Sequence, residues 1–481
     1  MTVNILGSSG PERERTFPGS WYVCSRPERK VNGTLTVPLV GRPTLKLQGT
    51  LLDEKLLLQD ETIVGTTHGG FSVTLAHAGY RNQSRPWFSG IDYGGQRPPV
   101  LEETWDCWAV AVGVELPSAG DTQVTEMVFR SRRLRDWAAS VGPEFEESEN
   151  ERTLGGELTL PDDIETTVPW GTVTLHWGAV GSTSQHGASL RYFPELQVLL
   201  ANPVTIDDTW ALVVTPLLQF LTLATGVGDA LECVRYRSDP TDELDGHGKD
   251  SFGDLLFGGW FEWVSSSWVT EPKDDEDVQE FNQPVDARGA VENIGPMLSR
   301  WSDLCQRAEA PLLDYFATLM WKSMTFEESF AHIVRALEVL HTTIQPGPRI
   351  PPEEFKAVKK KLRDALKDDP HKDLVLSRLK HADAFSLRDR LVDLLGRCGH
   401  RLHNYAGDIQ TFAGWVRDRR DGFTHTSSLG TSDHRELMRA HVILDLAMRS
   451  VLLREIGVNP DDLDERVFRT DVARTLLYPV R

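Results

Sequence analysis

The strongest constraint on the fold of this chain is a change of hydrophobic period near residue 290. Before it, short segments such as Thr44–Gln48 alternate apolar and polar residues with a period of two, which is typical of β-strands. After it, apolar residues recur three or four positions apart, as in 324–340, which is typical of amphipathic helices. Because the two periods belong to different elements, the sequence predicts a β-rich part followed by an all-helical part.

The first part, from about residue 15 to 205, is expected to consist of short strands. An Asn-Gly pair at 32–33 predicts a turn in front of one strand, and a Gly-Gly pair at 69–70 predicts a hairpin between strands at 62–65 and 71–75. Many short strands joined by such turns indicate a sandwich-like or barrel-like unit.

A helical portion is expected within residues 210–270. The segment 216–225 is apolar and starts with a proline, which suits the first turn of a helix. Thr215 is the candidate N-cap and Gly226 suits the C-terminal end. The acidic, proline-bearing stretch 271–286 then predicts a linker or a mobile surface loop.

The second part is expected to form an antiparallel helical bundle, because several amphipathic segments are joined by loops of modest length. Asp433 and Glu436 form a candidate capping pair for a long final helix. The chain is therefore predicted to be an α+β multidomain protein, with a β-rich domain at 1–290 and an all-helical domain at 291–481.

The net charge excludes a general nucleic-acid coating protein. It is −20, from 51 basic and 71 acidic side chains, and such a surface repels polyanions at long range. Residues 353–425 differ, with 16 basic and 12 acidic side chains and a local net charge of +4. This local excess indicates either one confined anion site or a solvated helix face of mixed charge.

The composition favours a cytoplasmic protein. The five cysteines are scattered without a CxxC pair, no secretory signal is expected at the start, and no apolar stretch reaches about 20 residues. We therefore expect no membrane association, no disulfide framework, no cofactor and no metal.

A basic cluster at 417–425 is the most informative candidate site, with three arginines and one histidine near an expected helix end. On an unbroken helix Arg420 and His425 do not share a face, since five steps of about 100° separate them. We expect Gly422 to end the helix and let the chain bring His425 back towards Arg420. The alternative is a basic helix terminus and a turn, where positive charge suits the helix dipole.

The six residues from Arg420 to His425 match the R-[N/D]-x-x-x-H signature of HEPN ribonucleases. The second part resembles the ApeA-like HEPN domain more closely, with Ala336-Leu337-Glu338 on an early helix and the Arg…Thr-His segment later in the chain. The first part resembles the ApeA N-terminal domain. The matching stretches there are 17–21, 33–35, 65–67, 129–137 and 218–226.

The resemblance implies a metal-independent endoribonuclease that cuts RNA, with tRNA as the expected substrate class. An imidazole that titrates near neutral pH makes His425 the general acid/base. A guanidinium binds phosphate with two parallel hydrogen bonds, so Arg420 stabilises the developing charge. Asp421 completes the catalytic set by orienting Arg420 or His425. The supporting residues are Glu338, Thr424 and Arg417, and Glu338 either tunes Arg420 or forms a structural ion pair.

The resemblance also implies a homodimer through the HEPN domain. Pairing of two such dimers would give a higher oligomer. The implied role is abortive defence against phage, with the β-rich domain sensing a phage-derived trigger or restraining the nuclease.

Two other readings remain open at this point. In one, the helical domain only dimerises, and the β-rich domain recognises a ligand or protein partner. In the other, the β-rich domain binds a carbohydrate or nucleotide. We expect neither zinc at the incomplete ligand set Cys398, His400 and His403 nor chemistry at His332 and His341, which suit core or boundary positions. The strand tryptophans at 105, 108, 170 and 177 are expected to be mostly core.

Overall fold

The chain divides into two compact units, which are described separately below. Unit 1 comprises Met1–Glu280 and Val285–Gly295, and unit 2 comprises Phe281–Pro284 and Pro296–Arg481. The computed structural model describes residues 2–7, 14–38, 41–51, 61–84, 102–116, 118, 121–150, 153–184, 187–238, 248–249, 255–256, 259–265, 282–320, 324–379, 382–425, 433–468, 470 and 473.

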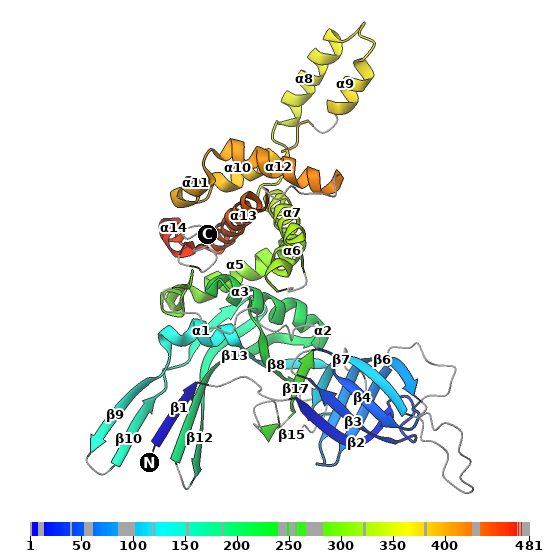
Figure 1. Cartoon of the computed structure of the whole chain (residues 1–481), viewed down its shortest axis with the longest axis vertical. Helices are drawn as coiled ribbons and strands as arrows, with labels where there is room; N and C mark the ends of the chain where they lie inside the picture. The colour runs from blue at the N-terminus through cyan, green and yellow to red at the C-terminus, as the bar shows by residue number, and fades with distance from the viewer. Residues whose placement is uncertain are drawn as a thin grey trace. The chain divides into compact units, whose positions relative to one another are not determined.

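Unit 1 is built on a 13-stranded sheet, part of which closes into a barrel. The barrel strands follow the order β7-β4-β3-β2-β5-β6, and β6 also pairs with β7, which closes the ring (Figure 1). Closure removes the exposed strand edges of this part of the sheet. The barrel strands are β2 (Arg15–Val23), β3 (Val31–Val37), β4 (Thr44–Gln48), β5 (Glu61–Thr67), β6 (Ser72–Ser84) and β7 (Glu102–Val112).

The rest of the sheet stays open and continues from β7 in the order β17-β14-β8-β13-β12-β11, with β1 pairing in parallel to β13. Two short hairpins, β9–β10 and β15–β16, lie outside this sheet. The bounds are β1 (Thr2–Gly7), β8 (Gln123–Ser131), β9 (Glu144–Asn150), β10 (Thr153–Thr159), β11 (Ile164–Val168), β12 (Gly171–Ser184), β13 (Gly187–Thr205), β14 (Leu231–Ser238), β15 (Gly248–Lys249), β16 (Leu255–Leu256) and β17 (Trp260–Ser265).

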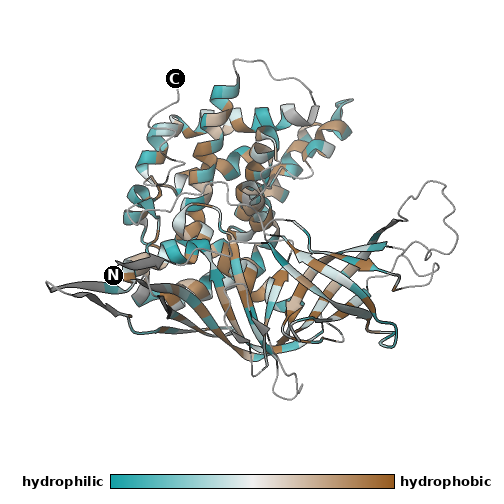
Figure 2. Cartoon of the chain, turned by 60° about the horizontal axis from the view of Figure 1, so that its bottom comes forward, coloured by the Kyte–Doolittle hydropathy of each residue, from teal (hydrophilic) through white to brown (hydrophobic). Residues whose placement is uncertain are grey.

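The barrel interior is packed with apolar side chains around Trp21 and Trp105, both nearly fully buried. Apolar residues run along these strands, while hydrophilic ones gather towards the strand ends (Figure 2). A Cβ atom at Gly65 would lie only 2.2 Å from the Trp21 ring, so glycine lets the neighbouring strand approach the indole. The predicted core role of the strand tryptophans holds for Trp105 and Trp177, whereas Trp108 is 48% exposed.

One of the two predicted turns is wrong. Gly69-Gly70 does join β5 to β6 as an antiparallel hairpin. Asn32 and Gly33, however, lie inside β3 and pair with β2, because the turn into β3 lies earlier, at residues 24–28. An Asn-Gly pair favours a turn locally, and here pairing on both sides of the strand overrides that preference.

The helix predicted at 216–225 is longer at its start than expected. Helix α2 (Ile206–Thr209), the π-helical stretch η2 (Trp210–Val214) and α3 (Thr215–Thr225) are continuous, so Thr215 is not the N-cap. Thr205 caps the start instead, accepting a hydrogen bond from the Asp208 amide at 3.1 Å. The π-helical turn accommodates the proline that follows it, since proline cannot donate to a regular helical ladder. Gly226 ends α3 as predicted, with a left-handed φ of 80°.

Four shorter helical elements complete unit 1. They are α1 with its 3-10 extension η1, which lie beside α3 and β13, and α4 with η5 near the end of the unit. Their bounds are α1 (Arg132–Ala138), η1 (Ala139–Val141), α4 (Ala287–Ala290) and η5 (Val291–Asn293).

Unit 2 is helical throughout its described residues. The predicted apolar stripe on α7 is confirmed, since Phe330, Val334 and Leu337 are buried, and a capping box between Thr325 and Glu328 starts that helix. Its helices are α5 (Ile294–Arg307), α6 (Glu309–Met320), α7 (Phe326–Ile344), α8 (Pro352–Ala365), α9 (Lys372–Arg378), α10 (Leu387–Gly396), α11 (His400–Ala406), α12 (Ile409–His425), α13 (Asp433–Glu455) and α14 (Pro460–Val467).

The predicted fold class is confirmed, because a β-rich part precedes an all-helical part. The helix at 433–455 is long, as expected, but α14 follows it, so it is not the last. The proposed linker at 271–286 lies mostly outside the described residues.

Candidate functional site

Helix α12 carries the basic cluster and runs without interruption from Ile409 to His425. The expected helix break at Gly422 is therefore wrong. Glycine inside a helix costs about 1 kcal/mol relative to alanine, which weakens a helix without ending it. Along this helix the backbone positions of Arg420 and His425 are about 140° apart, from five steps of about 100°.

The orientation of α12 follows from its apolar residues. Ala413 and Val416 are fully buried, and Arg420 lies on the same face because the three positions are spaced three and four residues apart. This face packs in the region where α12 meets α7 and α10. The helix thus turns Arg420 towards its neighbours instead of into open solvent.

Arg420 contacts two carboxylates. Its Nη2 atom lies 3.2 Å from Glu338 Oε2 on α7, and its Nη1 atom lies 3.2 Å from Asp421 Oδ1. The side chains of Arg420 and Glu338 are 37% and 29% exposed, so the ion pair is reachable by solvent. The structure therefore brings together three of the predicted site residues, Arg420, Asp421 and Glu338.

The other predicted residues are not part of this contact. Arg417 pairs with Asp418 at 2.6 Å. The side chains of Thr424 and His425 lie outside the described residues, although both backbones belong to α12. Because Thr424 follows Arg420 by four positions, the helix places both on one face.

An arginine that the sequence did not single out holds α10 against α7 beside Glu338. The Nη1 atom of Arg390 donates a hydrogen bond to the Glu338 carbonyl oxygen at 3.2 Å and another to Thr342 Oγ1. Its Nε atom donates to the Phe385 carbonyl oxygen at 3.1 Å. The sequence carries no signal for this role, since a lone arginine on an amphipathic helix normally faces solvent.

His341, one turn after Glu338, is a core histidine as expected. It is fully buried, and its Nε2 atom lies 3.1 Å from Asp393 Oδ2. Burial lowers the pKa of His341, and the nearby Asp393 carboxylate offsets this only in part. His341 is therefore neutral at neutral pH and shielded from any substrate. His332, on the same helix, pairs with Asp314 at 3.1 Å.

The incomplete zinc set does not converge. Cys398 donates to the Leu394 carbonyl oxygen, His403 contacts the Leu395 carbonyl oxygen at 2.7 Å, and His400 pairs with Asp464 at 2.7 Å. Across the described parts of both units, no three histidine, cysteine or acidic side chains gather as metal ligands would.

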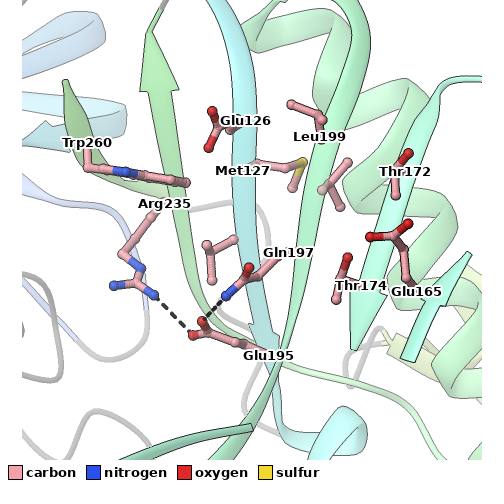
Figure 3. A pocket seen from close by; sticks show the side chains of 12 residues that line it. Glu126, Met127, Glu165, Thr172, Thr174, Glu195, Gln197, Leu199, Arg235 and Trp260 are labelled. Atoms are coloured by element: carbon pink, nitrogen blue, oxygen red, sulfur yellow. Dashed lines mark hydrogen bonds and ion pairs between the residues drawn. The ribbon is translucent and has the colours of Figure 1, made fainter. Parts of the chain in front are cut away.

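The sheet of unit 1 holds a second gathering of charged side chains. They lie on one face of the open sheet, around a hollow of about 510 Å³ (Figure 3). Glu195 on β13 accepts hydrogen bonds from Arg130 at 2.7 Å, from Arg235 at 3.1 Å and from Gln197 at 3.0 Å. Burial raises the pKa of Glu195, but the two guanidinium groups outweigh that effect and hold it below its usual range.

This hollow is unsuited to a phosphate. The arginine that lines it, Arg235, is already paired with Glu195, and the carboxylates of Glu126 and Glu165 add negative charge to its wall. The sequence contained a signal for it, because Glu195-x-Gln197 and Arg235-x-Arg237 alternate charged or polar residues at strand period. Strand pairing alone shows that these side chains meet. Arg235 on β14 and Gln197 on β13 both pair with Val128 on β8, which lies between them.

The fold and the site together define a two-part protein, with a partly closed β-barrel unit ahead of a helical unit whose late helix carries an Arg…His motif paired to an earlier helix. Two family models match this arrangement: ApeA N-terminal domain 1 over residues 17–247 and Apea-like HEPN over residues 332–462. The chain therefore belongs to the ApeA-like HEPN proteins.

The matched HEPN region contains Glu338, Arg420 and His425. HEPN domains are generally ribonucleases and typically dimerise. No curated protein and no solved structure matches the chain. Among the helices that the structure describes, none has the length and apolar character needed to cross a membrane.

Proposed function

We propose that this protein is a metal-independent endoribonuclease of the HEPN class that acts in anti-phage defence. The observation that carries the proposal is the contact of Arg420 with Glu338 and Asp421 inside the region matched by the HEPN model. It supports a cation that is held in place at a surface that solvent reaches.

The proposed reaction uses the 2′-hydroxyl of the RNA as nucleophile. Its oxygen forms a bond to phosphorus, the bond from phosphorus to the 5′-oxygen breaks, and the products are a cyclic phosphate and a 5′-hydroxyl. His425 takes the 2′ proton as general base, and an imidazolium returns a proton to the leaving oxygen. Arg420 stabilises the charge that builds on the phosphate oxygens.

Glu338 acts as a positioning residue in this scheme. An ion pair that is about one-third exposed contributes little stability, on the order of 0–1 kcal/mol, because water competes for both partners. A phosphate can therefore replace Glu338 as the partner of Arg420 without a large penalty, and hydrogen bonds from guanidinium to phosphate are strong. Asp421 orients the guanidinium, and Thr424 lies on the face that a phosphate at Arg420 would meet.

The reaction needs both an acid and a base, whereas each chain supplies one His425. The unbroken α12 also places Arg420 and His425 on different faces of the helix. A symmetric dimer answers both points, because a two-fold axis brings the motif of a second copy opposite the first. The β-rich unit then restrains or releases the dimer in response to a phage-derived trigger, in the cytoplasm, with tRNA as substrate.

Induction of the full-length chain in cells, alone and during phage infection, tests the proposal by mapping of RNA ends. We expect cyclic-phosphate ends at defined tRNA positions, reduced at least 100-fold by Arg420→Ala and by His425→Ala, since such groups contribute about 10²–10⁴-fold. Arg419→Ala is the matched control from the same helix, because its guanidinium lies over the Trp415 ring, 5.5 Å from the centroid. Folded Arg420 and His425 variants that cut as well as the parent would refute the assignment and favour a non-catalytic binding protein.

A further inference from the structure

The α8–α9 hairpin contributes almost nothing to the core of unit 2. Of its two helices, α8 buries only Phe355 and α9 buries no residue. The hairpin stands away from α7 and α10, between which it is inserted (Figure 1). Leu374 on α9 is 59% exposed. Core packing therefore does not explain why the chain carries this hairpin.

One face of α8 is a stripe of four cations. Lys356, Lys359, Lys360 and Arg363 occupy positions i, i+3, i+4 and i+7, which share a helix face. We call these four residues the basic stripe. Lys356, Lys360 and Arg363 are exposed. Lys359 is half-buried, and its Nζ atom lies over the ring of the buried Phe355, 4.3 Å from the centroid.

The basic stripe differs from two other cations of unit 2 that have carboxylate partners. Arg307 pairs with Asp303 at 2.8 Å, and Arg397 pairs with Asp393 at 2.7 Å, each at the i, i+4 spacing. Within the described residues, none of the four stripe cations forms an ion pair with a carboxylate. Like charges on neighbouring turns repel one another, and a polyanion laid along the stripe would relieve that repulsion.

The hairpin is rooted beside the candidate site. Its first helix follows α7, which carries Glu338, and its second precedes α10, which packs against α12, the helix that carries Arg420. At about 1.5 Å per residue, the distance along the helix axis from Glu338 to the end of α7 is about 9 Å, and α8 is about 21 Å long. A ligand that fills the site and also reaches the stripe must therefore span tens of ångströms.

From this placement we infer that the basic stripe binds the phosphate backbone of a folded RNA whose strand is cut at Arg420 and His425. The inference rests on the proposed function and adds a second binding surface, which requires an RNA with a stem long enough to extend from the site along α8. Phosphate contacts position a nucleic acid without reading its sequence, and proteins recognise double-stranded RNA mainly by its shape and backbone. A flexible short strand gains nothing from such an arm.

The salt dependence of RNA binding tests the inference. Binding of total tRNA and of a short single-stranded oligouridylate to the full-length His425→Ala protein is measured across a salt series, so that no cleavage occurs. Each phosphate contact contributes about 0.7–0.9 to the slope of log K against log salt. Changing all four stripe residues to glutamine should therefore lower the slope for tRNA by about 3 and leave the oligouridylate slope unchanged.

Neighbouring lysines provide a matched control. Lys360→Gln should lower the tRNA slope by about one contact, whereas Lys361→Gln should not change it, because Lys361 points about 100° away from Lys360 on the same helix. Far-UV circular dichroism of each variant checks that α8 and α9 remain folded.

Two results would overturn the inference: a parental tRNA slope in the quadruple variant, or an equal loss for Lys360→Gln and Lys361→Gln. Absence of tRNA binding by the parent would overturn it as well. The proposed function fails independently, when Arg420→Ala and His425→Ala leave cleavage unchanged, and the binding measurement does not depend on cleavage.

Discussion

The charged residues on the open sheet and those of the basic stripe on α8 differ in burial and in ion pairing. On the sheet, Glu195 is 7% exposed and contacts Arg130 and Arg235, so its charge is paired within the fold. On α8, Lys356, Lys360 and Arg363 are exposed on a hairpin that buries only Phe355. The first arrangement uses its charges to join strands, and the second leaves them available to a partner.

The difference teaches that net charge is a poor guide to where this protein meets a polyanion. The chain carries −20 overall, yet the sheet's arginines are committed to carboxylates, while α8 presents Lys356, Lys360 and Arg363 as exposed cations with no carboxylate partner within the described residues. Desolvation explains the contrast, because a buried charge without a partner costs several kcal/mol whereas an exposed one costs little.

The largest expected effect concerns the buried charges of the sheet. Glu195→Ala leaves the Arg130 guanidinium, 5% exposed, without its carboxylate, and removing one partner of a buried pair costs about 3–5 kcal/mol. Glu126→Ala is the matched control, since its pair with Arg237 spans 3.0 Å on the same sheet but is 33% and 40% exposed, and such pairs contribute about 0–1 kcal/mol. Urea unfolding of both variants measures the difference, and equal losses would remove the distinction on which the comparison depends.

A smaller effect is expected from pH. The pKa of Glu195 is lowered in the folded protein, so its contribution to the free energy of unfolding is full above the unfolded value of about 4.5 and is lost as pH falls through the folded value. The stability difference between parent and Glu195→Ala should therefore be constant near neutral pH and shrink in acid. A difference that grows as pH falls would contradict the sign of this shift.

The smallest expected effect lies at the candidate site, which is intermediate between the two regions. Glu338 and Arg420 are paired, as on the sheet, but about one-third exposed. Glu338→Gln should therefore lower the free energy of unfolding by less than about 1 kcal/mol, as measured by thermal or urea unfolding. A loss as large as that for Glu195→Ala would place Arg420 among the structural charges and weaken its proposed role towards phosphate.

Several elements of the fold were predictable because their signals are local. The Gly-Gly pair at 69–70, the left-handed end of α3 at Gly226 and the apolar stripe of α7 each depend on residues within a few positions of one another. The predictions that failed were also local: pairing with distant strands overrode the first, and the small cost of a glycine inside a helix explains the second. Strand pairing kept residues 32–33 extended in β3, and the regular ladder of α12 continued through Gly422.

Of the candidate site, the residue types were predictable and the partners were not. The motif identified Arg420 and His425 as candidates, and the resemblance added Glu338, 82 positions earlier. Arg390, which ties α10 to the Glu338 backbone, had no recognisable pattern of its own. The strand-period alternation around Glu195 was visible in the sequence, but it did not show which side chains meet.

By itself, the amino-acid sequence determined which segments become strands and which become helices, and where the two families of elements meet, because hydrophobic period and capping act within one or two turns of chain. Only the tertiary structure decided which charges face each other, since strand register and helix packing join residues that lie tens to hundreds of positions apart. A carboxylate on one helix and a guanidinium on another carry no mark of their pairing until both helices are packed.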